Sequence, residues 1–462
     1  MNILVELVHP AHFYYYRDTI ANLKRDGHKV IVAIVTKDVL EDVVRAAGVE
    51  YVNICPVSHK KWGKIGVAMD MVKRDWRMLW LAIRNRVDII TGSTIETAHI
   101  GWLLRKPNIN IGEDDAAVVS KYIKSIAPFV GVRLTPDCTD NGPIEAKSVH
   151  FPGYFKTAYL RPGYFTPDAK VVSGYGMPLL VNQKNTEKNT ESSDTCSIST
   201  VLTPQSTHEQ APGLLDDSSR SIDSIAQTLS NDSVQKTQKI LSSNNPLNNI
   251  AENPFAPYFI LRFASLNAHH DSGIKGINTE IAQRLIDILA PHGTIYITSE
   301  RPLEPQFEQF RIRINPLDMH HVMAFSSLYI GDSQTMAAEA GVLGVPFVRF
   351  NDFVGRIGYL RELEDVYQLG YGIHATPLAA GSPIHRADGS EQQSGVEALY
   401  AKVQELVAMK DEERKALFQE RRMKMLSEKI DCTKFLTWFI EQYPASAQEV
   451  KNATPDFWDK FK

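Results

Sequence analysis

The stretch from residue 326 to 348 most constrains the fold, because it has the pattern of one parallel strand-helix-strand unit. The apolar run Leu328 to Ile330 favours a strand that must end at Gly331, and a second strand is indicated at Phe347 to Phe350. Between them lie Ser333 and other residues that commonly begin helices. Strands joined through a helix in this way pair in parallel.

The same alternation of short apolar runs and helical patterns extends through most of the chain, which predicts two parallel sheets. The expected strands are Ile3 to Val8, Val30 to Ile34, Tyr51 to Ile54, Asp88 to Ile90, Ile109 to Ile111 and Val132 to Leu134, then Tyr258 to Phe263, Thr294 to Thr298, Phe310 to Ile314, Leu328 to Ile330 and Phe347 to Phe350. We therefore expect an α/β fold with two Rossmann-like domains, residues 1–173 and 255–430. A helical, aromatic tail, 431–462, is expected to pack across both domains.

Residues 182–254 separate the two series and have a different composition. They are rich in Ser, Asn, Thr and Gln and contain no aromatic residue, so they cannot bury enough apolar area to offset their chain entropy. We predict a disordered insertion that acts as a linker. A transient helix around Ile222 to Val234 is the alternative.

Charge and cysteine content exclude several classes of protein. A formal net charge of -4 gives no general case for nucleic-acid binding. The four cysteines include no CxxC pair, which argues against a zinc site or a disulfide framework, so no metal is expected. The amino terminus has no basic region before its apolar run, and no run reaches the roughly 20 apolar residues of a membrane helix. We expect a cytoplasmic protein.

The helix expected to start near Ser333 is the first candidate binding site. The free amides of a first helical turn, here Ser333, Gln334 and Thr335, can hold a phosphate. Glu339 lies one turn beyond Thr335 and could accept the hydroxyls of a ribose. The alternative is an ordinary connection with a surface glutamate.

Histidines and acids after the strands of the first series are the candidate catalytic groups. His9 and His12 follow the first expected strand, where a neutral imidazole could take a proton from a hydroxyl acceptor. Glu113 begins a run of three acids after another strand. The alternatives are a histidine that caps its helix or packs on tyrosines, and acids that suit a first helical turn.

Two further segments carry candidate contacts. Ser265, His269 and His270 follow the first strand of the second series, and they suit phosphate or sugar better than a metal, which would need more ligands. Residues 60–83 form a basic, aromatic, amphipathic helix in which Ile65, Val72 and Trp76 share one face. That face could lie in an anionic lipid interface or could pack on the sheet.

Several ordered motifs resemble a prokaryotic family known as domain of unknown function three hundred fifty-four. The motifs are His9 to His12, Gly112 to Asp115, Leu134 to Pro136, Phe151 to Tyr154, Arg262 with Phe263, Ala268 to Asp271, Gly331 to Met336, Glu339 with Ala340, and Leu343 with Gly344. That family is similar to the GT-B superfamily of glycosyltransferases and UDP-N-acetylglucosamine 2-epimerases. The resemblance implies two Rossmann-like domains, an acceptor site on the first, a nucleotide sugar on the second, and no metal.

The resemblance also implies roles for the candidate residues. Ser333, Gln334, Thr335 and Glu339 would bind diphosphate and ribose, and His12 would be the base for the acceptor of a glycosyltransferase. A lipid-linked molecule is one candidate acceptor. A UDP-sugar 2-epimerase is the alternative, in which Glu113, His269 and His270 would act, but Ser93 stands where its aspartate would fall. A non-catalytic nucleotide-sugar-binding protein is the third reading. With such an acceptor, the protein would act in the synthesis of the cell envelope or of surface polysaccharide. Residues 60–83 would then make peripheral contact with the inner membrane.

Overall fold

The computed structural model describes residues 1–37, 39–56, 63–180, 253–264, 275–379, 381–382, 384–386 and 388–462. Residues Met1–Pro178 and Phe255–Lys462 form one compact unit. The predicted disordered insertion, 182–254, lies almost wholly outside the described residues, as does the helix considered around residue 222. Its disorder therefore stays a prediction.

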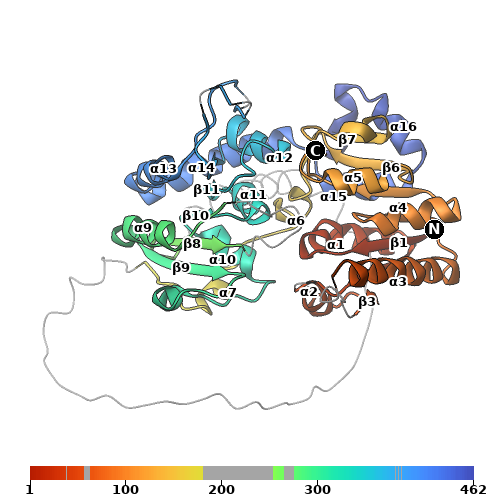
Figure 1. The fold of residues 1–462 in the computed structure, drawn as a ribbon, viewed down its shortest axis with the longest axis horizontal. Helices are drawn as coiled ribbons and strands as arrows, with labels where there is room; N and C mark the ends of the chain where they lie inside the picture. Colours follow the sequence, from red (N-terminus) through yellow and green to blue (C-terminus); the bar gives the residue numbers. More distant parts are fainter. Residues whose placement is uncertain are drawn as a thin grey trace, which may run out of the picture. The chain divides into compact units, whose positions relative to one another are not determined.

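The first sheet has seven parallel strands in the order β3-β2-β1-β4-β5-β6-β7 (Figure 1). Its strands are β1 (Asn2–Leu7), β2 (Lys29–Val35), β3 (Val52–Cys55), β4 (Ile89–Gly92), β5 (Asn108–Ile111), β6 (Val132–Pro136) and β7 (Ser148–Phe151). The central strand β1 pairs on both sides, with Ile3 opposite Val30 in β2 and opposite Ile89 in β4. The six expected strands are confirmed to within about two residues, and β7 was not predicted.

Helices cover both faces of this sheet. They are α1 (Pro10–Arg25) and α2 (Leu40–Ala46) on one face, and α3 (Gly63–Arg84), α4 (Ile95–Leu104) and α5 (Ser120–Ile126) on the other. The alternation of side chains along β1 matches this division. Ile3, Val5 and Leu7 share a core with α1, whereas Leu4 shares a core with Met78 of α3.

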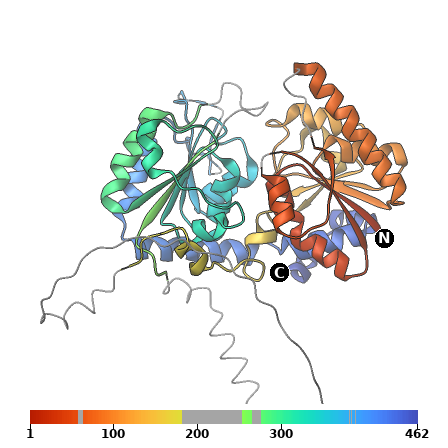
Figure 2. The same ribbon diagram turned by 90° about the horizontal axis from the view of Figure 1, so that it is seen from below.

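The second sheet has five parallel strands in the order β12-β11-β10-β8-β9 (Figure 2). Its strands are β8 (Tyr258–Phe263), β9 (Thr294–Ser299), β10 (Leu328–Gly331), β11 (Phe347–Phe350) and β12 (Gly370–Ile373). Helices α9 (Thr279–Leu289), α10 (Met319–Phe325), α11 (Gln334–Leu343) and α13 (Val396–Ala408) pack around it. The prediction of two parallel Rossmann-like sheets is confirmed.

The strand expected at Phe310 to Ile314 is wrong. A 3-10 turn, η5 (Pro305–Phe310), occupies its start, and only Arg311 makes an isolated bridge, to Ile297. The alternating residues Ile312 and Ile314 are partly buried against the core rather than paired in the sheet. The alternation of apolar residues indicated a strand here. These side chains are partly buried without the hydrogen-bonded pairing that a strand would make.

The remaining elements include connections within each half and the helices that return the chain to the first sheet. They are η2 (Gly142–Lys147), α6 (Thr157–Leu160), α7 (Ala169–Ser173), η4 (Ala290–His292), α12 (Gly358–Arg361), the π-helical turn η6 (Glu362–Val366), α14 (Asp411–Glu428), α15 (Cys432–Glu441), α16 (Ala445–Lys451) and η7 (Pro455–Phe461). Figure 1 shows α15 and α16 beside the first sheet, where α15 packs on α1 and α16 on β7. Thr433 of α15 donates a hydrogen bond to the carbonyl of Ala158 (2.8 Å).

None of the helices within the described ranges is both long enough and apolar enough to span a bilayer.

Candidate functional site

Each sheet contains a strand that ends in a glycine and is followed by a helix with a side-chain cap. A Cβ on Gly92, at the end of β4, would lie 2.9 Å from the Glu6 carbonyl oxygen. A Cβ on Gly331, at the end of β10, would lie 2.8 Å from the Arg262 carbonyl oxygen. Any larger residue would bring its Cβ too close to these carbonyl oxygens, so glycine is required at both positions. A helix begins within a few residues of each of these glycines. The candidate site is built at these carboxyl ends.

The first turn of α11 has the geometry expected for an anion site. Ser333 is its N-cap residue and accepts a hydrogen bond from the Met336 amide (3.5 Å). The Gln334 side chain is held in place, because its amide oxygen accepts hydrogen bonds from Arg349 and from Asn351 (both 3.1 Å). The amides of a first helical turn point along the axis toward a ligand. The roles predicted for Ser333, Gln334 and Thr335 are thus sterically possible and stay predictions.

Arg349 is itself fully buried and forms an ion pair with Glu364 (2.8 Å). A buried guanidinium needs such a partner to offset its desolvation. Burial raises the pKa of Glu364 despite the attraction of Arg349. The pair fixes the side chain of Gln334 rather than offering a free charge to a ligand.

Glu339 is buried in the structure, where the sequence had suggested a side chain open to ribose. Its Oε1 accepts a hydrogen bond from the Tyr159 hydroxyl (2.6 Å) and lies 3.2 Å from His320 Nε2. Although burial opposes ionisation, the charge of His320 and these hydrogen bonds lower the pKa of Glu339. Tyr159 and His320 thus already occupy Oε1 of Glu339, and the role of this residue in binding ribose stays a prediction.

His9 and His12 take different places at the end of β1. His9 is the N-cap of α1, and its Nδ1 accepts a hydrogen bond from the Ala11 amide (3.1 Å). This is the capping role that the sequence left open, and a catalytic role of His9 stays a prediction. His12 follows in the first turn of α1, with its ring 5.9 Å from that of His9 and 6.0 Å from that of Tyr15.

The His12 imidazole is kept neutral by its surroundings. Burial, with His9, Lys37 and Lys156 nearby, lowers the pKa of His12 well below 6.5. Its Nδ1 is buried and has no hydrogen-bond partner among the residues that the structure describes. A buried nitrogen without a partner costs about 1–3 kcal/mol, which a ligand hydroxyl could recover.

Glu113, after β5, belongs to a compact ionic cluster. Its Oε1 accepts from the Tyr15 hydroxyl (2.7 Å) and forms an ion pair with the fully buried Lys156. The Lys156 ammonium also donates to the Tyr15 hydroxyl (3.0 Å) and lies 4.4 Å from the centroid of the Tyr359 ring. The second oxygen of Glu113 is buried and, within the described ranges, has no hydrogen-bond partner.

Tyrosine rings connect these groups. Tyr15 stands 6.0 Å from both the His12 ring and the Tyr159 ring, measured between centroids. Its hydroxyl contacts Glu113, while that of Tyr159 contacts Glu339. The structure thus brings His12, Glu113 and Glu339 into one aromatic network.

Sequence reasoning missed Lys156, Tyr159 and His320. Lys156 and Tyr159 lie in and just before α6, which immediately follows the motif at Phe151 to Tyr154. That motif was the available signal, but it did not show that the next residues turn inward. Ser265, His269 and His270 lie outside the described residues, and their binding roles stay predictions.

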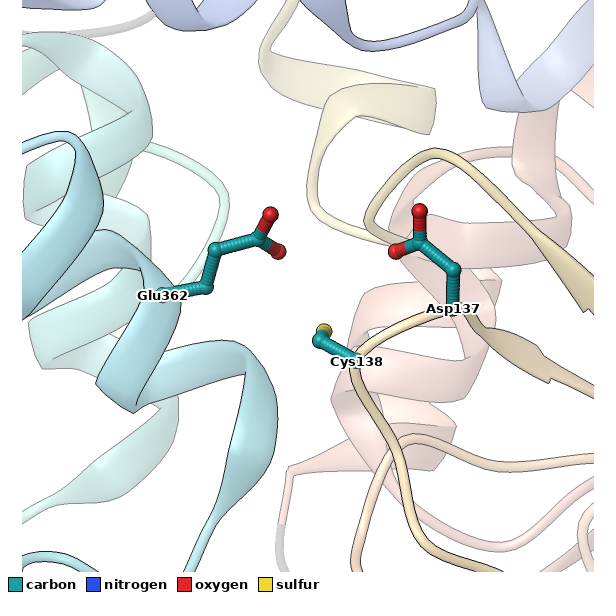
Figure 3. A group of neighbouring side chains, drawn as sticks. All are labelled: Asp137, Cys138 and Glu362. Atoms are coloured by element: carbon teal, nitrogen blue, oxygen red, sulfur yellow. The ribbon is translucent and has the colours of Figure 1, made fainter. Parts of the chain in front are cut away.

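One group of side chains has the spacing of metal ligands. Asp137, Cys138 and Glu362 each offer one ligand atom, and these atoms lie within 4.8 Å of one another (Figure 3). The Lys429 ammonium already lies 2.7 Å from Glu362 and 3.5 Å from Asp137. Burial raises the pKa of the Cys138 thiol, which disfavours the thiolate that binds metals. We assign no metal to this group.

Comparisons with solved structures establish the fold. S. aureus MnaA, solved with UDP, matches with a TM-score of 0.54 and 9% identity over 98% of each chain. The spinosyn forosaminyltransferase SpnP matches with a TM-score of 0.51 and 11% identity, over 96% of this chain and 98% of that one. The chain has the GT-B fold.

A third match, at a TM-score of 0.52 and 10% identity over 96% of each chain, is a Listeria monocytogenes protein assigned as a UDP-N-acetylglucosamine 2-epimerase. No protein-family model matches the chain, and no curated protein matches it in sequence. The resemblance to the GT-B superfamily is therefore supported at the level of fold, and the resemblance to the narrower family of unknown function stays an expectation.

Proposed function

We propose that this protein is a glycosyltransferase that moves a sugar from a nucleotide sugar, UDP-linked, to a hydroxyl acceptor. The observation that carries the proposal is the pair of buried polar atoms without partners, His12 Nδ1 and Glu113 Oε2, at the carboxyl ends of β1 and β5. Ligands of parallel α/β sheets bind at that edge. Buried polar atoms are normally hydrogen-bonded, so a bound substrate that supplies the missing hydrogen bonds would explain these two atoms.

His12 is the proposed general base. Because its pKa lies well below 6.5, the imidazole is unprotonated at neutral pH and can accept the proton of an acceptor hydroxyl. Proton transfer to a positioned base of this kind contributes on the order of a hundredfold or more to a rate. The new glycosidic bond would form as the bond from the sugar to UDP breaks, and UDP would leave with the electron pair.

The nucleotide is proposed to bind at the second sheet. The first turn of α11, capped by Ser333, would hold the diphosphate, and the second carboxylate oxygen of Glu339 would meet the ribose. That S. aureus MnaA, a protein of the same fold, was solved with UDP supports UDP as the nucleotide. The lowered pKa keeps Glu339 ionised, as an acceptor for ribose hydroxyls must be.

A 2-epimerase is the second candidate, and the ionic cluster of Glu113, Tyr15 and Lys156 beside His12 favours it. Epimerisation requires an acid and a base on opposite sides of one carbon. Glu113 and His12 both lie at the strand ends, with Tyr15 6.0 Å from the His12 ring and Lys156 paired with Glu113. The residue after Gly92 is Ser93 rather than a carboxylate, which favours transfer.

One experiment separates the two reactions. The protein is incubated in heavy water with a panel of UDP-sugars, and released UDP and deuterium at the sugar C2 are both measured. Transfer predicts UDP release that a correct acceptor accelerates, with no deuterium at C2. Deuterium at C2 without UDP release would establish the epimerase and remove the transferase.

The His12→Ala variant tests the base. We expect the acceptor-stimulated rate to fall by about a hundredfold or more, with UDP affinity changed by no more than a few-fold. His292→Ala, which removes an exposed histidine far along the chain, is the matched control. Because the His12 pKa is lowered, the acid limb of kcat/KM should lie below pH 6.5 and disappear in His12→Ala. Full activity in His12→Ala would exclude His12 as the base.

A further inference from the structure

Helix α3 has two apolar sides, and only one of them contributes to the core. Met78, Leu81 and Ala82 are buried against the first sheet. On the other side, Val72 and Trp76 are each 69% exposed. The alternative that this predicted face packs on the sheet is therefore wrong for Val72 and Trp76, because the sheet is covered by the opposite side of the helix.

The exposed apolar side continues along α3 and onto the neighbouring helix α4. Trp80 and Ile83 are 52% and 59% exposed, and Trp102 and Leu103 of α4 are 58% and 55% exposed. We call these residues, with Val72 and Trp76, the tryptophan face. Among the described residues, the half of the unit built on the second sheet exposes only Val366 and Met423 as large apolar side chains.

A groove of about 340 Å³ runs between the two helices of the tryptophan face. Its apolar lining comes from Val72, Trp76, Leu79, Ile100, Trp102, Leu103 and Phe129, and the paired Asp75 and His99 also line it. The Phe129 ring stands 5.2 Å from that of Trp102 and orders this wall of the groove. An exposed apolar surface of this kind is costly in water and marks a binding surface.

The charges around the tryptophan face are almost all positive. Exposed basic residues on or beside α3, α4 and α5 are Lys73, Arg77, Arg84, Arg105, Lys106, Lys121 and Lys124. None of the described acids within these three helices is exposed: Asp70 and Glu96 are buried, and the half-buried Asp75 is paired with His99. One exposed acid, Asp88, follows α3. This local excess of positive charge stands against a formal net charge of -4 for the chain.

We propose that the tryptophan face binds an anionic lipid bilayer as a peripheral membrane surface. Tryptophan side chains favour the interface between lipid and water, and surrounding lysines and arginines are attracted to anionic headgroups. A second copy of this chain fits less well, because two such faces would bring their positive rims together. The proposal goes beyond the proposed transfer reaction and holds whichever reaction the site performs.

Vesicle sedimentation with the full chain tests the proposal. Vesicles of phosphatidylcholine alone are compared with vesicles that also contain phosphatidylglycerol. We expect binding to the anionic vesicles to be at least about tenfold tighter, and to weaken as salt is added. Equal binding to both kinds of vesicle, or no binding to either, would overturn the proposal.

Two pairs of substitutions locate the surface. Trp76→Ser with Trp80→Ser should weaken binding to anionic vesicles by about tenfold or more, whereas Val366→Ser, which removes an exposed apolar residue elsewhere, should not. Lys73→Glu with Lys106→Glu should act in the same way through charge. Lys410→Glu with Lys424→Glu, the control, changes net charge equally but far from this face in sequence.

Light scattering of the same variants addresses self-association. All the substituted side chains are exposed, so the melting temperature should stay nearly unchanged. If the wild-type protein forms dimers that the tryptophan variants abolish, and no variant changes vesicle binding, the face is an interface between copies and the lipid proposal fails. Vesicle binding that is lost only in the variants of the tryptophan face supports it.

Discussion

The two halves of the compact unit share one plan but distribute polar and apolar residues differently. Strand β1 of the first sheet carries the fully buried Glu6, whereas Arg262 of β8 reaches the partly exposed Glu300. On the outside, α9 buries Leu285 and every other large apolar residue of its sequence. Helix α3, by contrast, exposes Trp76 on the side away from the sheet.

The difference separates what folding requires from what it does not. The apolar side of α9 is accounted for by the core, as in most surface helices. The second apolar side of α3 has no counterpart on α9 and contributes nothing to the core. Buried ion pairs, by contrast, occur in both halves, as Arg349 with Glu364 shows in the second. Features that cost stability in one half and are absent from the other are the ones to examine for function.

The largest effect should come from Lys156, where the first half buries charge most completely. Lys156→Met leaves the Glu113 carboxylate buried without its cation, which should lower the free energy of unfolding by about 3–5 kcal/mol. Arg262→Met in the second half breaks an ion pair that solvent reaches and should cost no more than about 1 kcal/mol. Urea unfolding measures both, and equal losses would show that burial does not decide how much each ion pair contributes to stability.

An intermediate effect is expected from Glu6, and it depends on pH. Burial, then the neighbouring Glu96, raises the pKa of Glu6 from 4.5 to about 8. Between these values the folded state holds a proton that the unfolded state releases, so the free energy of unfolding falls as pH rises. The slope is at most about 1.4 kcal/mol per pH unit.

Glu6→Gln cannot release that proton and should remove this part of the pH dependence. The contribution is fully present below pH 4.5 and is lost as pH rises through about 8, so the variant should gain on the wild type over that window. Glu397→Gln, at an exposed position of α13, is the control. Parallel stability curves for Glu6→Gln and the wild type would contradict the raised pKa.

The smallest effect should come from the outer face of α3. Ile83 is 59% exposed, so Ile83→Ser should change the free energy of unfolding by less than about 0.5 kcal/mol. Leu285→Ala, at a fully buried position of α9, should cost about 2–5 kcal/mol. Thermal unfolding compares the two. A large loss in Ile83→Ser would mean that this face does support the fold, and the contrast between the helices would be reduced.

Much of the fold could be predicted from local pattern because parallel strands need apolar runs and turn residues at their ends. Strands β7 and β12 were missed for a local reason. Gly370–Ile373 contains two glycines, and Ser148–Phe151 alternates polar with apolar residues over only four positions. Their pairing is supported by neighbouring strands rather than by their own propensity.

The candidate site could be predicted only in part. His12 and Glu113 follow strands, so their place at the sheet edge could be inferred from the order of elements. Lys156 lies 43 residues from Glu113 in the sequence, and no spacing rule connects them. The same holds for Tyr159, whose partner Glu339 lies 180 residues away.

The sequence by itself determined the two parallel sheets, the glycine that ends β10, and the cap of α11 at Ser333. These features depend on side-chain size and on hydrogen bonds within a few residues, so they can be predicted from the local sequence pattern. Only the tertiary structure decided that Glu339 is enclosed by Tyr159 and His320, and which apolar side of α3 faces the sheet. Burial and pKa are set by distant segments that pack together, and a linear pattern does not specify which segments those are.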